Sequence, residues 1–191
     1  MVSINSVVLR VLDMSLAAMG LMTLWPLLLI LYFLGLLDTG SPIFRQERVG
    51  RFQQPFTLVK FRTMKLSTAS VASHLAESES ITPLGVFLRR TKLDELPQLW
   101  NVLLGDMSLV GPRPCLFNQT ELIKERYARS VFDARPGITG LAQVNNIDMS
   151  TPKLLAETDA LMLKSMNLRV YFKYIFMTIS GQGAGDRVKT K

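Results

Sequence analysis

The longest apolar stretch of the chain runs from Met14 to Leu37 and has Pro26 near its centre. The side chains with a hydroxyl group in this stretch are Ser15, Thr23 and Tyr32. As a straight helix it would extend about 36 Å at 1.5 Å per residue, which is enough to cross a bilayer. A transmembrane helix is therefore the first interpretation, and a cleaved signal peptide fits less well because no small-residue cleavage site follows. Pro26 supports a third interpretation, since a proline bends a helix and lets it enter and leave on the same membrane face.

Residues 40–50 and 56–64 alternate weakly between polar and apolar positions and are bounded by Gly and Pro. This pattern predicts a short pair of β-strands. Lys60 and Arg62 would share one face of the second strand, because side chains two positions apart point the same way, and Arg48 would lie on or near the partner strand. Three cations placed in this way suit one anionic ligand, whereas the alternative is a solvated strand face.

A helix is predicted just after the acidic pair Asp94-Glu95. Apolar residues recur there at helical spacing, at Leu96, Leu99, Val102 and Leu103. Pro97 is compatible only with the first turn of such a helix. Asp94 is therefore expected at the N-cap or in the first turn, where unpaired N–H groups and the helix dipole favour its charged form.

The charges around this pair suggest phosphate chemistry. Arg89, Arg90 and Lys92 precede it and would attract a phosphorylated substrate. Asp94 would then attack the phosphate as a nucleophile while Glu95 helps to hold a hard cation. The alternative is a plain helix cap with solvated charges.

Two rigid loops that carry arginine follow the acidic pair. Arg113 lies between Pro112 and Pro114, and Arg135 opens a run to Asn145 that contains Pro136 and two glycines. Glycines permit close backbone approach, so the second run could cradle a nucleotide or a phosphate. By itself a Pro-Gly pair also fits an ordinary turn.

The rest of the chain is predicted to be helical, apart from a mobile loop at 65–80 that contains His74 and a flexible basic tail at 182–191. An amphipathic helix opens at Thr151-Pro152, with Asp159 on its polar side. Its apolar stripe comprises Leu154, Leu155, Leu161 and Met162. Residues 168–179 mix aromatic and basic side chains, which fits either a helix in the membrane interface or core packing. The fold class is thus mostly α with a small β-hairpin (α+β).

Composition and charge limit which binding partners and which cellular compartment are expected. The net charge is +7 and the isoelectric point about 9.8, but no nucleic-acid-binding motif is present, so anionic lipids and a nucleotide diphosphate are the expected partners. Arginines at 45, 48 and 51 follow the apolar segment and place its downstream side in the cytoplasm. Cys115 is the single cysteine and cannot form an internal disulfide. We expect a membrane segment at 1–38 and one catalytic domain at 39–181.

Five motifs in order resemble the bacterial sugar transferase family, the monotopic phosphoglycosyl transferases, in their small form with only the catalytic domain. They are Phe44–Gly50, Lys60–Met64, Leu93–Asn101, Gly105–Pro114 and Arg135–Gly140. The resemblance implies transfer of a sugar 1-phosphate from a uridine diphosphate (UDP) sugar to undecaprenyl phosphate, with release of uridine monophosphate (UMP). This reaction is the first membrane step of glycoconjugate synthesis.

The resemblance also implies roles for individual residues. Asp94 matches the nucleophile of a ping-pong mechanism and Glu95 its partner carboxylate, and both would ligate Mg²⁺. Arg113 matches a phosphate clamp. The other matching positions of functional weight are Arg48, Lys60, Arg89 and Asp159, to which the residue patterns add Arg62 and Arg135 as phosphate-binding candidates.

For the membrane segment, the resemblance implies a re-entrant helix that is broken at a Ser-Pro pair, with both ends on the cytoplasmic face of the bacterial inner membrane. Here Trp25 precedes Pro26. We therefore expect Thr23 to replace the serine by bonding back to a preceding carbonyl.

Two rival functions are weaker. A membrane-anchored glycosyltransferase would move only the sugar and release UDP, but the sequence has no Asp-x-Asp motif for its metal. A non-catalytic membrane scaffold would leave the Asp94-Glu95 pair and the Pro-Arg-Pro loop unexplained.

Overall fold

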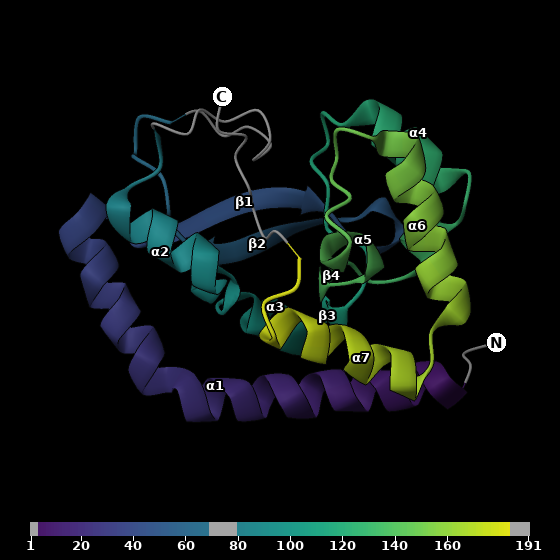
Figure 1. Ribbon diagram of the computed structural model, residues 1–191, viewed down its shortest axis with the longest axis horizontal. Coiled ribbons are helices and arrows are strands. Elements are labelled where there is room, and N and C mark those ends of the chain that lie inside the picture. Colours follow the sequence, from purple (N-terminus) through teal and green to yellow (C-terminus); the bar gives the residue numbers. More distant parts are fainter. Residues whose placement is uncertain (1–3, 69–79, 184–191) are drawn as a thin grey trace.

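The computed structural model describes residues 4–68 and 80–183. They form a mostly helical protein with two small sheets, which confirms the predicted fold class at this level. The long helix α1, Ile4–Thr39, lies along one side of a body built from all later elements (Figure 1). In the part of the chain described, α1 is the one helix long and apolar enough to cross a membrane. Only 11% of its most apolar window is buried in the protein, so its surface is compatible with membrane anchoring.

Helix α1 bends in its middle. Figure 1 shows one part running along α7, Leu168–Ile179, and a second part turning toward α2, Pro83–Thr91. Pro26 lies inside the helix and cannot donate a backbone hydrogen bond. Thr23 Oγ1 donates to the carbonyl oxygens of Met19 at 2.9 Å and Gly20 at 3.3 Å, which confirms the expected back-bonding.

The predicted strand pair is confirmed. Strands β1, Ile43–Val49, and β2, Pro55–Phe61, run antiparallel on either side of the short 3-10 turn Arg51–Gln53. Arg48 lies opposite Phe56, and Phe44 lies opposite Lys60. Residues directly opposite share a face, so Arg48 and Lys60 project from the same side of the hairpin. Arg62 lies just beyond the end of β2.

A second sheet was not predicted from the sequence. Strand β3, Ser108–Val110, pairs in parallel with β4, Gly137–Thr139. The two chains approach so closely that a Cβ atom on Gly137 would lie 2.0 Å from the backbone nitrogen of Gly111. Gly137 also donates its N–H to Pro112 O at 2.8 Å. This contact fixes the loop that carries Arg113 against the Arg135-Pro136 loop.

The predicted helix start at Asp94 is wrong in detail. Helix α2 ends at Thr91 and is capped by Lys92, which adopts a left-handed conformation with φ 58°. Asp94 then lies in a separate 3-10 turn, Leu93–Glu95, and helix α3, Gln98–Leu104, begins only after Pro97. Pro97 has no N–H for the carbonyl of Leu93, which instead accepts from Leu96 N at 3.3 Å, so the chain closes a tighter turn before the helix starts.

The remaining helical segments lie between β3 and α7 in the sequence. They are α4, Thr120–Tyr127; the 3-10 turn Val131–Asp133; α5, Leu141–Val144; and α6, Pro152–Ser165. The apolar stripe predicted on α6 is narrower than expected, since Leu155 and Met162 are buried while Leu154 and Leu161 are exposed.

Helix α7 confirms the core-packing interpretation on one face, and its membrane-interface interpretation stays a prediction for the other. Tyr171 and Tyr174 are buried in the core. On the opposite face an exposed apolar stripe runs along the helix and comprises Leu168, Phe172, Phe176 and Ile179. We call these four residues the α7 stripe. The face of α7 opposite its core residues is therefore apolar and suited to a membrane interface.

Candidate active site

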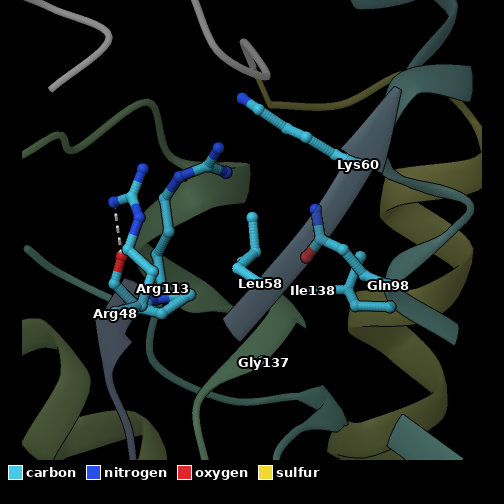
Figure 2. A pocket seen from close by; sticks show the side chains of 8 residues that line it. Arg48, Leu58, Lys60, Gln98, Arg113, Gly137 and Ile138 are labelled. Carbon is cyan, nitrogen blue, oxygen red and sulfur yellow. Dashed lines mark hydrogen bonds between the residues drawn. The ribbon is translucent and has the colours of Figure 1, made fainter. Parts of the chain in front are cut away.

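A pocket opens where the hairpin, α3 and the two arginine-bearing loops meet (Figure 2). Its lining residues are Arg48, Leu58, Lys60, Gln98, Arg113, Pro114, Gly137 and Ile138. Three of the eight are cationic and no acid lines it. Such a lining favours an anionic ligand with a partly apolar body.

Arg48 connects the hairpin to the Pro-Arg-Pro loop. Its Nη1 donates to Pro114 O at 3.1 Å and its Nη2 to Gln46 Oε1 at 2.5 Å. Lys60 reaches into the same pocket from β2, with its Nζ 5.6 Å from the ring centre of Phe44. Both cations are 7% exposed, so their charges act in a site of low dielectric constant, where they attract an anion more strongly than in water.

The acidic pair lies beside the pocket. Asp94 is 2% exposed and Glu95 8% exposed, both on the 3-10 turn between α2 and α3. Glu95 Oε1 forms an ion pair with Arg113 Nη2 at 3.1 Å. This pair brings the predicted nucleophile turn and the predicted phosphate clamp together.

Arg113 is supported from behind by a buried ion pair. Arg126 of α4 donates from Nη1 to the carbonyl of Arg113 at 2.8 Å. Its Nη2 and Nε donate to Asp159 Oδ2 at 2.7 and 3.0 Å. Arg126 is 2% exposed and Asp159 0% exposed. Burial raises the pKa of Asp159, and the adjacent guanidinium opposes that shift.

The prediction that Asp159 lies on the polar side of its helix is wrong, because its carboxylate is buried against Arg126. Asp159 lies behind the pocket wall and does not line the pocket. Arg126 does not stand out in the sequence. The available signal was its place four residues after Leu122, on the face of α4 that is otherwise apolar and buried.

Three other predicted phosphate-binding arginines lie outside the pocket lining. Arg89 Nε donates to Thr63 Oγ1 at 2.8 Å, and Arg135 Nε donates to Gly105 O at 2.8 Å. Arg62 bonds the carbonyls of Ser41 and Ile43 at 2.8 and 3.4 Å. Burial, together with nearby Arg10 and Arg51, lowers the pKa of Arg135. As substrate-binding residues these three stay predictions.

Lys92 connects the C-terminal end of α7 to the turn that carries Asp94. The Nζ of Lys92 donates to Gln182 O at 2.6 Å and to Thr178 O at 3.5 Å. The hydroxyl groups of Thr178 and Thr139 also share a short hydrogen bond. Burial lowers the pKa of Lys92; Glu95 opposes this shift and Arg113 adds to it. The helix with the α7 stripe is thus tied to a residue two positions before Asp94.

The comparison with known sequences identifies the family. The sequence model of the bacterial sugar transferases matches residues 4–182, almost the whole chain. This chain belongs to the bacterial sugar transferase family. The five motifs that suggested the family all lie within the matched range, and the resemblance is confirmed.

Relatives of this sugar transferase include enzymes with named substrates. It is 38% identical to a UDP-galactose-lipid carrier transferase of Erwinia amylovora over 192 aligned residues, which cover 87% of this chain and 39% of the relative. It is 38% identical to an undecaprenyl-phosphate galactose phosphotransferase of Salmonella typhimurium over 165 residues, 74% of this chain and 34% of the relative. The sugar transferase EpsL of Bacillus subtilis is 40% identical over 144 residues, 75% of this chain and 71% of the relative. The chain spans only 34% to 39% of the length of the first two.

The Mg²⁺ ion that the family resemblance implies would have few protein ligands among the described residues. Among the described residues, no cluster of three or more His, Cys, Asp and Glu side chains is present. Mg²⁺ does not require one, because it keeps several waters and commonly binds one or two carboxylates together with substrate phosphates. The adjacent carboxylates of Asp94 and Glu95 fit that donor set. Most of the predicted loop at 65–80, with His74, and the tail from 184 onward lie outside the described residues.

Proposed function

We propose that this bacterial sugar transferase moves a sugar 1-phosphate from a UDP-sugar to undecaprenyl phosphate and releases UMP. The observation that carries the proposal is the buried Asp94-Glu95 pair beside a pocket with three cations. The names of the Erwinia and Salmonella relatives, which refer to UDP-galactose, a lipid carrier and undecaprenyl phosphate, support both substrate classes. The reaction is a membrane step in the assembly of a surface or protein-linked glycan.

Arg48, Lys60 and Arg113 bind the diphosphate of the donor. Their positive charges, two of them almost completely buried, balance the two negative charges of a nucleotide sugar diphosphate. Leu58 and Ile138 supply the apolar part of the pocket lining. The ion pair with Glu95 and the bond from Arg126 hold Arg113 in place, so less side-chain entropy is lost on binding.

In the first half-reaction, an oxygen of the Asp94 carboxylate attacks the phosphorus that bears the sugar. A bond forms between that oxygen and phosphorus, and the bond from phosphorus to the bridging diphosphate oxygen breaks. UMP leaves with the bonding electron pair, and the phosphosugar remains on Asp94 as an acyl phosphate. The pocket cations lower the repulsion between the anionic nucleophile and the anionic donor.

In the second half-reaction, a phosphate oxygen of undecaprenyl phosphate attacks the same phosphorus. The Asp94–phosphorus bond breaks, which regenerates the carboxylate and gives the lipid diphosphate sugar. Mg²⁺ held by Asp94 and Glu95 would supply further neutralisation of phosphate charge. The two steps follow a ping-pong order, because UMP departs before the lipid reacts.

The membrane arrangement supports a lipid acceptor. Arg10, in the first half of α1, contacts the end of α3, and Leu31, in the second half, packs against Phe61 and Leu88. One protein body cannot lie on both sides of a bilayer, so α1 enters and leaves on the same face. The arginines that follow α1 support a cytoplasmic location for this face, at the bacterial inner membrane. The α7 stripe then lies in the interface.

Identification of the released nucleotide tests the function. Detergent-solubilised protein is incubated with Mg²⁺, undecaprenyl phosphate and UDP-glucose, UDP-galactose or N-acetylated UDP-sugars. UMP released with one of these donors, together with a lipid-linked sugar diphosphate, supports the proposal. UDP as the product would instead indicate sugar-only transfer, and no product from folded protein with any donor would favour the scaffold.

A further inference from the structure

Asp13 is a buried carboxylate in the first half of the largely apolar helix α1. It is 3% exposed, and its Oδ1 accepts three hydrogen bonds. The donors are Tyr171 Oη at 2.8 Å, Leu109 N at 2.9 Å and Ser108 Oγ at 3.0 Å. One oxygen atom therefore joins the membrane helix to α7 and to β3. Burial and the nearby Asp13 carboxylate raise the pKa of Tyr171, so this phenol stays a hydrogen-bond donor.

Arg10, one turn earlier, makes a second set of contacts. Its Nη2 donates to Val102 O at 2.8 Å and its Nη1 to Met107 O at 3.2 Å. Val102 lies in the last turn of α3, where a cation is favourable, and its carbonyl also accepts from Gly105 N at 3.2 Å. Arg10 Nη1 also lies 4.0 Å from Asp13 Oδ2. The first half of α1 is thus docked on the body by polar contacts.

The docked segments lead directly into the pocket. Strand β3 ends at Val110, three residues before Arg113, and its central residue Leu109 donates to Asp13. Helix α3 begins with the pocket residue Gln98 and ends where Arg10 binds. Displacement of α1 would therefore move two of the segments that carry pocket side chains.

We propose that Asp13 is a positioning residue of the transferase, which docks the first half of the membrane helix on β3 and α7 and so fixes the place of Arg113. It touches no reacting atom and acts through β3. The inference rests on the function proposed above, because its kinetic consequence concerns UMP release. An unpaired carboxylate on a helix that contacts lipid is costly, and the three donors compensate that cost only when the helix is docked.

Two substitutions at one position separate the roles of hydrogen bonding and charge. Asp13→Asn keeps an oxygen where all three donors converge but removes the charge, whereas Asp13→Ala removes the acceptor altogether. Ser15→Ala is the matched control, because it removes an exposed polar group from the same half of α1. Tyr171→Phe removes a single donor and keeps the buried ring.

The test combines a pre-steady-state burst with hydrogen exchange. In the absence of lipid acceptor, the burst amplitude of UMP counts functional enzyme, whereas its rate reports the geometry of the first half-reaction. For Asp13→Ala we expect an unchanged amplitude, a rate about tenfold lower and faster exchange of the Leu109 amide. Asp13→Asn and Ser15→Ala should stay close to the wild type in all three, and Tyr171→Phe should lie between.

The outcomes that overturn the inference are specific. An unchanged burst rate in Asp13→Ala would do so, as would a reduced amplitude at normal rate, which indicates loss of folded enzyme only. An Asp13→Asn variant as slow as Asp13→Ala would overturn the role of the acceptor oxygen. If Asp13→Ala does not fold, a wild-type burst rate in Tyr171→Phe decides against the inference. Absence of UMP from the wild type would contradict the proposed function, while Leu109 exchange would still test the docking.

Discussion

Asp94 and Glu95 are neighbours in sequence but have different surroundings, and this difference suggests a division of labour. Glu95 pairs with Arg113 at 3.1 Å, so its charge already serves to orient the clamp. Asp94 lies one position earlier on the same tight turn and is almost fully buried. Removal of the two carboxylates should therefore slow UMP release to different extents.

Asp94→Asn keeps the size of the side chain and removes its nucleophilic charge. We expect UMP release to fall by about a thousandfold or more, with little change in thermal stability. Glu95→Gln is the paired variant; it weakens the hold on Arg113 and should slow the burst but leave it measurable. Stopped-time assays of UMP measure both. Full activity in Asp94→Asn would exclude the covalent mechanism.

Arg126 and Asp159 form a buried pair whose structural and functional effects can be separated. Asp159→Leu leaves the Arg126 charge buried without its carboxylate, and we expect the unfolding free energy to fall by about 3–5 kcal/mol. The double variant Arg126→Met with Asp159→Leu should recover most of that stability but not the bond to Arg113 O. Its UMP burst should stay slow.

Denaturant unfolding and burst kinetics on the same samples measure these two effects. If the double variant regains wild-type burst rates, Arg126 does not position Arg113 and the pair serves stability alone.

At the scale of elements, α3 holds the hairpin in place through one amide. Asn101 Nδ2 donates to Thr57 O at 2.8 Å, and its Oδ1 accepts from Val59 N at 3.1 Å. These bonds satisfy backbone groups of β2 on the side away from β1. The strand that carries Lys60 is thus fixed to the helix that carries Gln98.

Asn101→Ala should lower the unfolding free energy by about 1–3 kcal/mol, because it leaves partly buried backbone groups of β2 unsatisfied. Chemical denaturation gives the value. Asn145→Ala is a suitable comparison, since that exposed amide bonds the carbonyl of Leu141 one turn earlier and its loss should cost much less. Equal losses in the two variants would contradict this account of β2.

Helix α7 combines a core face with the α7 stripe, and the stripe should determine how the body meets lipid. Phe176 is 72% exposed, and Phe176→Ser should reduce binding to liposomes while the fold is kept. Leu154 is 50% exposed at the start of α6, at the end of that helix away from α1 (Figure 1), and Leu154→Ser is the matched control.

Flotation of the two variants with vesicles compares them directly. Equal liposome binding by Phe176→Ser and Leu154→Ser would show that the α7 stripe does not contact the membrane.

At the scale of the whole molecule, the sequence predicted what local patterns encode. The hairpin, the membrane helix and the back-bond of Thr23 follow from alternation, hydropathy and the place of Pro26 within a few residues. The separate turn of Asp94 does not follow from the sequence pattern, because Pro97 also fits the first turn of a longer helix. The pattern does not show that the carbonyl of Leu93 accepts from Leu96 N in a tighter turn.

Contacts between segments that are far apart in the sequence do not produce a local pattern of hydrophobic and polar positions. Tyr171 and Asp13 are 158 positions apart, and Arg126 and Asp159 are 33 apart. The three-residue strands β3 and β4 pair across the body and are too short to show a period of two. The pocket cations could be predicted as candidates, but the supports that hold them depend on this long-range packing.

The most direct test of the account is the intact mass of the protein after brief incubation with Mg²⁺ and its UDP-sugar in the absence of undecaprenyl phosphate. The covalent mechanism predicts that the wild type gains the mass of one sugar phosphate and releases one equivalent of UMP, that the adduct maps to Asp94, and that added undecaprenyl phosphate removes it. Asp94→Asn should gain nothing. An unmodified wild-type protein that nevertheless forms lipid-linked product would contradict the account.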